Sequence, residues 1–218
     1  SGKDEDGRVV DVPRELVSPR FVLNERVNGI NKKDRDALRN NYVDTSAVSF
    51  VDPSGSGELI VALSKDPVVK HMVYSLNPKS KFVNGSVQAG KDFYESLKAQ
   101  GALVIGATEA NNLRNNAYNE RKTREEFFDY IAEGDSKLVQ DNLKLVQERR
   151  GGSMADRMGL YLHSDKGWRL VCLVNVGNNY GDADSYDNAD YNYGRLVGVS
   201  DGVASTEGAV AKNLAQPK

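Results

Sequence analysis

The sequence predicts an α+β fold built on a mixed, mainly antiparallel sheet. Three observations support this class: short strand-like and helix-like segments alternate in the first part, helical patterns dominate residues 88–150, and apolar residues after Ser153 recur with a period of two. Consecutive strands after a group of helices are typical of α+β proteins, whereas doubly wound parallel folds alternate the two element types throughout. The 218 residues suffice for a sizeable core.

The first 87 residues divide into an arm and a second part. Residues 1–20 are mostly polar, and their one alternating stretch, residues 9–12, ends at Pro13, so we expect a flexible or strand-adding arm. Residues 21–87 are expected to be the N-terminal part of the domain or a small accessory subdomain.

This second part carries five segments with a strand or helix pattern. Residues 21–23 favour an early strand, and the charged stretch 31–40 favours a short surface helix. Residues 47–51 and 58–63 flank a turn rich in Pro, Gly and Ser, and therefore predict a β-hairpin. Pro67 can open a further helix at its first position.

Four helices and one short strand follow, each with a recognisable start or end. They are the helix 88–100 ending at Gly101, the buried strand 102–105, a brief helix capped by Thr108, a helix opened by the capping box Thr123–Glu126, and a helix capped by Asp135 or Ser136.

The remaining chain reads as strands. Alternating or continuous apolar residues predict strands over 159–163, 168–176 and 194–199. Residues 201–218 are small and polar, and we expect a mobile tail there.

The segment between the last two strands, residues 178–193, has an unusual composition. Asn, Tyr and Asp supply 12 of its 16 residues, four of each. Connections this long are uncommon in compact domains unless they are functional or disordered, and disordered segments are poor in aromatic residues. Tyr, Asn and Ser are typical of antibody-like binding surfaces. The alternatives are a solvated polar loop whose tyrosines pack locally, or a metal site.

Codons for Asn, Tyr, Asp and Ser differ chiefly by single changes at the adenines of an Asn codon. In this respect the run, together with the flanking Trp168–Leu173 and Gly194–Ser200 segments, resembles the variable proteins of diversity-generating retroelements, such as phage tropism determinants. The resemblance covers residues 88–200 and implies a C-type-lectin-like domain with a long C-terminal variable region. The implied ligand-contacting residues are Asn178, Asn179, Tyr180, Asp182, Asp184, Ser185, Tyr186, Asp187, Asn188, Asp190, Tyr191, Asn192 and Tyr193.

The resemblance also implies a role without catalysis. It predicts a display protein that recognises a protein or glycan ligand on a target cell, located on a virion or cell surface, with oligomerisation left open. The alternative is a structural phage or cell-surface protein without a diversified site. Such a protein could be stabilised by calcium, because Asp182, Asp184, Asp187 and Asp190 offer oxygen ligands. No other cofactor is expected.

Composition and motifs exclude several other classes. A net charge of −2 argues against a nucleic acid partner, and no apolar stretch approaches the roughly 20 residues of a membrane span. Residues 1–6 lack a signal-peptide pattern. His71 and His163 have no metal-ligand spacing, and Cys172 reads as a small buried residue, so no catalytic constellation is predicted.

Overall fold

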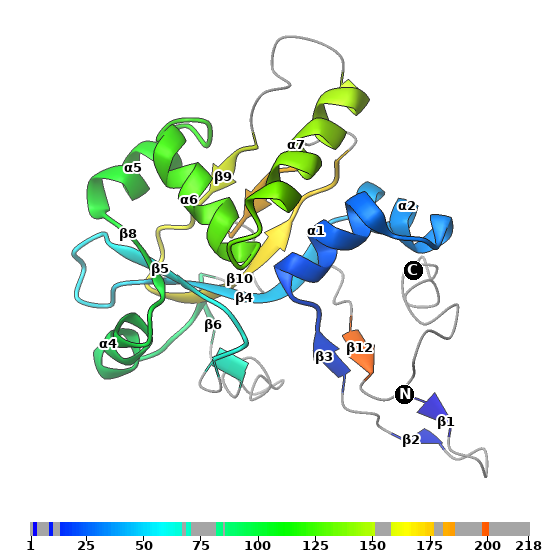
Figure 1. The fold of residues 1–218 in the computed structure, drawn as a ribbon. Coiled ribbons are helices and arrows are strands. Elements are labelled where there is room, and N and C mark those ends of the chain that lie inside the picture. Colours follow the sequence, from blue (N-terminus) through cyan, green and yellow to red (C-terminus); the bar gives the residue numbers. More distant parts are fainter. Residues whose placement is uncertain are drawn as a thin grey trace.

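A mainly antiparallel, eight-stranded sheet organises the protein, as the sequence predicts (Figure 1). The computed structural model describes residues 2–3, 9–10, 14–66, 69–70, 82–84, 86–150, 158–176, 181–185 and 198–200. Six strands pair in the order β6 (Phe82–Val83), β7 (Ser86–Val87), β10 (Gly167–Leu173), β4 (Val43–Val51), β5 (Leu59–Ala62) and β8 (Leu103–Ile105). Beside β10, β11 (Ala183–Asp184) pairs with β10 and also, in parallel, with β9 (Leu160–Tyr161).

The β4–β5 hairpin is confirmed, and it joins the two halves of the chain. Phe50 on β4 pairs with Ile60 on β5 and with Trp168 on β10, so strands from the first 87 residues and from the later part share one sheet. The turn between the strands is organised by Asp52, whose carboxylate accepts hydrogen bonds from the hydroxyls of Ser54 and Ser56.

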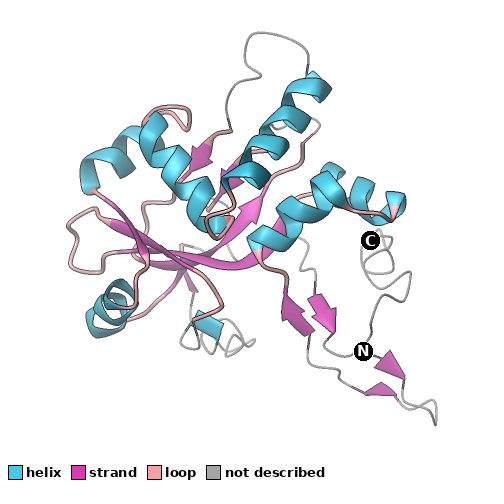
Figure 2. Ribbon diagram, in the orientation of Figure 1, coloured by secondary structure: helices cyan, strands magenta, loops and turns pink. Residues whose placement is uncertain are grey.

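Helices cover both faces of the sheet, and the two layers differ in size (Figure 2). The larger core is formed with α1 (Pro19–Asn28), α2 (Lys32–Asn40), α5 (Ala107–Asn115), α6 (Arg121–Ile131) and α7 (Ser136–Arg150). On the opposite face, α4 (Lys91–Ala99) packs Tyr94 and Leu97 against Phe50 and Trp168. Trp168 is buried under α4, and Cys172 on the same strand is also buried, as predicted for the cysteine.

Several helix predictions are confirmed. The charged stretch 31–40 is helical from Lys32, with the Asn31 side chain capping its start. Gly101 follows α4 with φ +91°, a left-handed conformation that favours glycine. Asp135 caps α7, because its carboxylate accepts the N–H of Leu138 at 3.0 Å.

Other predicted boundaries are wrong for local reasons. Residues 21–23 lie in α1 rather than in a strand, because Pro19 opens a helix and the Ser18 hydroxyl accepts the N–H of Phe21. Thr123 lies inside α6, which begins at Arg121, so the proposed capping box does not form.

Two further differences concern the next elements along the chain. Thr108 is the second residue of α5 and not its cap, since the cap position is held by Gly106. The strand predicted over 102–105 is an edge strand in which Val104 is 40% exposed and Ile105 is buried.

The N-terminal arm adds a strand, which is one of its two predicted roles. β3 (Arg14–Leu16) pairs with β12 (Gly198–Ser200), so the arm lies beside a strand that comes more than 180 residues later in the chain (Figure 1). A second small ribbon joins β1 (Gly2–Lys3) to β2 (Val9–Val10). The arm is shorter than predicted, because α1 begins at Pro19.

Three predictions extend beyond the described part of the chain. Val69 and Lys70 are helical after Pro67, and the rest of that predicted helix lies outside the described residues. The predicted tail 201–218 and the start of the strand 194–199 also lie outside them. Within the described residues, every helix is too short or too polar to cross a bilayer.

Candidate functional site

The Asn/Tyr/Asp-rich run has a described centre, residues 181–185, on which β11 lies. Three of the predicted contact residues, Asp182, Asp184 and Ser185, fall in this centre. The other ten lie outside the described residues: Asn178, Asn179, Tyr180, Tyr186, Asp187, Asn188, Asp190, Tyr191, Asn192 and Tyr193.

Backbone hydrogen bonds fix this centre to strands on both of its sides. Toward β10, the N–H of Val174 donates to Asp182 at 2.9 Å, and the N–H of Gly181 donates to Asn175 at 3.1 Å. Toward β9, the N–H of Ser185 donates to Tyr161 at 2.9 Å. The centre is therefore an interior strand of the sheet and not part of a free loop.

Gly181 meets two requirements that only glycine satisfies well. Its φ is +66°, in the left-handed region that other residues rarely adopt. A β-carbon placed there would lie 2.8 Å from Cγ2 of Val146 on α7. The glycine in the middle of the run is thus set by the backbone and by the packing of α7.

Asp182 links the run to two distant segments. The side chain is 2% exposed, and its carboxylate accepts hydrogen bonds from the N–H of Gly159 and from the hydroxyl of Tyr118, the latter at 3.0 Å. Burial raises the pKa of Tyr118, and the neighbouring charge of Asp182 raises that pKa further, so the phenol keeps the proton that it donates. Gly159 is also confined, because a β-carbon there would lie 3.1 Å from the ring of Tyr118.

The other two described positions differ in their access to solvent. Ser185 is 2% exposed, and its hydroxyl donates to the carbonyl oxygen of Tyr161. Asp184 is half-buried and pairs in register with Tyr161, whose side chain is 40% exposed. Asp182 and Ser185 therefore differ from the expectation of outward-facing contacts, since both are buried within the sheet. Asp184 keeps partial access.

The residues tested for other chemistry have ordinary structural environments. His163 is buried, with its two ring nitrogens 3.1 Å from the carbonyl oxygen of Asp165 and 3.4 Å from that of Ser49. Burial, and then the nearby charge of Arg169, lowers the pKa of His163 to about 3. Burial raises the pKa of the Cys172 thiol, so it stays protonated and unreactive.

The calcium alternative depends on residues only partly described. Among the described residues, no group of three or more acidic, histidine or cysteine side chains is placed to hold a metal ion. Asp187 and Asp190, two members of the predicted set, lie outside the described residues, and Asp182 already serves as the acceptor for Tyr118.

Sequence reasoning missed the residues that hold the centre of the run. Tyr118, Gly159 and Tyr161 lie 20 or more residues before it and carry no motif of their own. The visible signal was Gly181, the one glycine of residues 178–193, since an isolated glycine can mark a special backbone conformation or close packing.

No protein-family model matches the sequence, and no curated protein matches it. A solved structure from Nanoarchaeota, described as the accommodation of massive sequence variation by the C-type lectin fold, is similar to this chain with a TM-score of 0.52. The two share 12% sequence identity, and the match covers 81% of this chain and 83% of that one. This chain therefore has a C-type lectin fold, as the resemblance in its sequence implies.

Proposed function

We propose that this protein is a ligand-binding display protein whose Asn/Tyr/Asp-rich surface recognises a protein or glycan receptor. The observation that carries the proposal is the buried centre of the run, in which Gly181, Asp182 and Ala183 are held in the sheet by packing and hydrogen bonds. The residues before and after this centre have the composition of a binding surface. A diversified surface needs such a frame, because substitutions around it must leave the fold intact.

Attachments at two places support this proposal. β11 holds the centre of the run on the main sheet, and β12, five residues after Tyr193, is paired with β3 of the N-terminal arm. The segment 186–197 thus begins and ends at paired strands. Tethering both ends of a segment lowers the conformational entropy that it loses when it binds.

The composition suggests how the surface would recognise its receptor. Tyrosines supply large contact areas at low entropic cost, and Asn, Asp and Ser supply adaptable hydrogen bonds that discriminate among partners. Catalysis has no part in the proposal. Presentation of many copies on a virion or a cell would strengthen binding through avidity.

Two matched substitution libraries test the proposal. One randomises four flanking positions, Tyr180, Asp187, Asn188 and Asn192, and the other randomises Gly181, Asp182, Ala183 and Ser185. Each library is displayed and scored for resistance to protease. We expect most members of the first library to stay folded and most members of the second to unfold. Equal losses in both libraries would contradict the proposal.

Selection then separates a binding surface from a surface that merely tolerates change. The flanking library is panned on immobilised lysozyme as a test protein, and enrichment of folded binders is expected. Tolerance without any enrichment would favour the alternative of a structural protein whose polar loop serves assembly.

The encoding DNA offers an independent test of diversification. A near-copy of the segment for residues 178–193 should lie nearby and differ mainly where the copy has adenine. A neighbourhood with neither such a copy nor a reverse transcriptase gene would contradict diversification, while leaving ligand binding to be decided by the libraries.

A further inference from the structure

Two buried polar atoms without a hydrogen-bond partner lie beside His163. Within the described part of the chain, these atoms are Oγ of Ser49 on β4 and Nη2 of Arg114 on α5. His163 contacts both residues, because its carbonyl oxygen accepts the Nε–H of Arg114 at 3.0 Å and its ring Nε2 lies 3.4 Å from the carbonyl oxygen of Ser49. The two donors therefore belong to one polar cluster, which Asp165 and Arg169 complete.

Both donors lie in the larger core layer, between the sheet and its helices. Ser49 alternates along β4 with Ala47 and Val51, which belong to the larger core, so its side chain shares their face. Arg114 directly follows Leu113 on α5, and Leu113 belongs to the same core. Ser49 is 0% exposed, so this part of the layer is enclosed.

The cluster holds more positive than negative charge. Arg169 is 2% exposed, and its guanidinium pairs with the carboxylate of Asp165 at 2.7 Å. Arg114 has no ion pair among the described residues, and burial lowers the pKa of its guanidinium. Burial also lowers the pKa of His163, and the nearby charges of Arg169 and Arg114 lower that pKa further, so the ring is neutral. Two cations thus face one carboxylate.

The unpartnered groups select a ligand that accepts hydrogen bonds. A buried charge or polar group without a partner costs free energy, and an ion of opposite charge removes much of that cost. Arg114 offers an N–H and Ser49 offers an O–H, whereas the carbonyl oxygen of His163 already accepts from Arg114. An acceptor with negative charge satisfies both the donors and the charge balance. The full burial of Ser49 limits the size of this acceptor and favours a single-atom anion over an organic acid.

We propose that a chloride ion is enclosed between β4 and α5, where it accepts hydrogen bonds from Nη2 of Arg114 and Oγ of Ser49. The ion offsets the charge of Arg114, as the carboxylate of Asp165 offsets that of Arg169. It enters when α5 packs on the sheet and exchanges through local opening, so the site needs no exposed hydroxyl. The site shares no residue with the Asn/Tyr/Asp-rich run, and its test is therefore independent of the proposed display function.

Thermal unfolding of the full chain in matched salts tests the proposal. Sodium chloride and sodium bromide are compared with sodium gluconate at equal ionic strength, because gluconate is too large to be enclosed. A ligand that binds only the folded state raises the melting temperature as its concentration grows. We expect this rise in chloride and in bromide beyond that in gluconate. Equal melting temperatures in all three salts would overturn the proposal.

Two variants show whether the effect comes from this site. Arg114→Met should abolish the extra rise in chloride, because it removes the charge and one donor. Ser49→Ala removes only the hydroxyl, and it should increase about tenfold the chloride concentration that gives half of the effect, the scale of one hydrogen bond to a charge.

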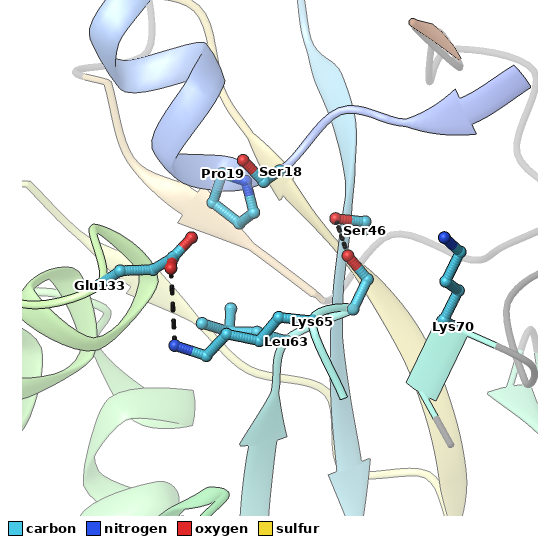
Figure 3. Close-up of a pocket in the computed structure, with 8 residues that line it drawn as sticks. Ser18, Pro19, Ser46, Leu63, Lys65, Lys70 and Glu133 are labelled. Carbon is cyan, nitrogen blue, oxygen red and sulfur yellow. Dashed lines mark hydrogen bonds and ion pairs between the residues drawn. The ribbon is translucent and has the colours of Figure 1, made fainter. Parts of the chain in front are cut away.

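Each variant has a matched control. Ser46→Ala also removes a buried hydroxyl from β4, but Ser46 Oγ already accepts from Ser64 Oγ at 2.7 Å (Figure 3). Lys122→Met also removes a positive charge, but from the exposed pair of Lys122 with Glu126. Both controls should keep the full chloride effect.

Bromide also locates the ion in the wild type, which keeps the proposal testable if Arg114→Met does not fold. Anomalous diffraction from crystals grown in sodium bromide should show a peak in contact with Arg114 and Ser49. A water molecule or a protein group at that position in bromide would overturn the proposal. So would a chloride effect that persists in Arg114→Met or that the two controls lose equally.

Discussion

Gly181→Ala is the substitution that most sharply probes the frame inside the Asn/Tyr/Asp-rich run. The new β-carbon would stand 2.8 Å from Cγ2 of Val146 on a backbone with φ +66°. The left-handed backbone costs about 1–2 kcal/mol for a non-glycine residue. Overpacking against a buried neighbour costs about 1–3 kcal/mol more. We therefore expect the free energy of unfolding to fall by about 2–5 kcal/mol, measured by urea denaturation.

Two further variants separate the backbone cost from the packing cost. Gly134→Ala is the matched control, because Gly134 has φ +82° and a β-carbon there would meet no atom within 4 Å. Its free energy of unfolding should fall only by the cost of the left-handed backbone, about 1–2 kcal/mol.

In a double-mutant cycle with Val146→Ala, the clash disappears, so the double variant should be more stable than additivity predicts by about 1–3 kcal/mol. Strict additivity, or equal losses at Gly134 and Gly181, would refute the packing of α7 on the run.

Three other predictions follow from hydrogen bonds and buried charge. Tyr118→Phe removes a donor from the buried carboxylate of Asp182 and should cost about 1–3 kcal/mol of unfolding free energy in urea denaturation; an unchanged value would show that this bond does not hold the run. Burial lowers the pKa of His163 to about 3 in the folded state, whereas the pKa in the unfolded state is about 6.5. Between these two pH values, the unfolded state binds a proton at His163 and the folded state does not. The wild type should lose up to about 1.4 kcal/mol per pH unit between those values from this group, and His163→Gln should lack that slope in denaturation measured across the range. Burial opposes ionisation of Asp52, but bonds from Ser54 and Ser56 lower its pKa to about 2. Its stabilisation is therefore complete above the unfolded value of about 3.9 and is lost as the pH falls toward 2, a loss that Asp52→Asn should not show.

Local chemistry made much of the fold predictable. The β4–β5 hairpin and the start of α2 follow from turn residues and from the Asn31 cap, which act within a few positions. Apolar content alone predicted the wrong element for residues Phe21–Leu23. These three residues lie in a helix because Ser18 caps α1 and Pro19 begins it. The Thr123 capping box failed for a related reason, since α6 begins two residues earlier at Arg121.

The features that could not be predicted from the sequence depend on contacts between residues far apart in the chain. The match of β3 with β12 joins residues more than 180 positions apart, and no local pattern encodes that partner. Asp182 looked like any other acidic residue of the run, yet Tyr118 and Gly159 make it a buried acceptor. Composition thus singled out the segment, whereas tertiary contacts bury Asp182 and Ser185 in its described centre.

The central claim is that a rigid sheet presents the tyrosines of residues 178–193 instead of burying them. Its most direct test is the unfolding free energy of a variant with Tyr180, Tyr186, Tyr191 and Tyr193 all replaced by alanine. The account predicts a loss of at most about 2 kcal/mol, the sum for four exposed substitutions. A loss beyond about 8 kcal/mol, or failure to fold, would place those rings in the core and contradict it.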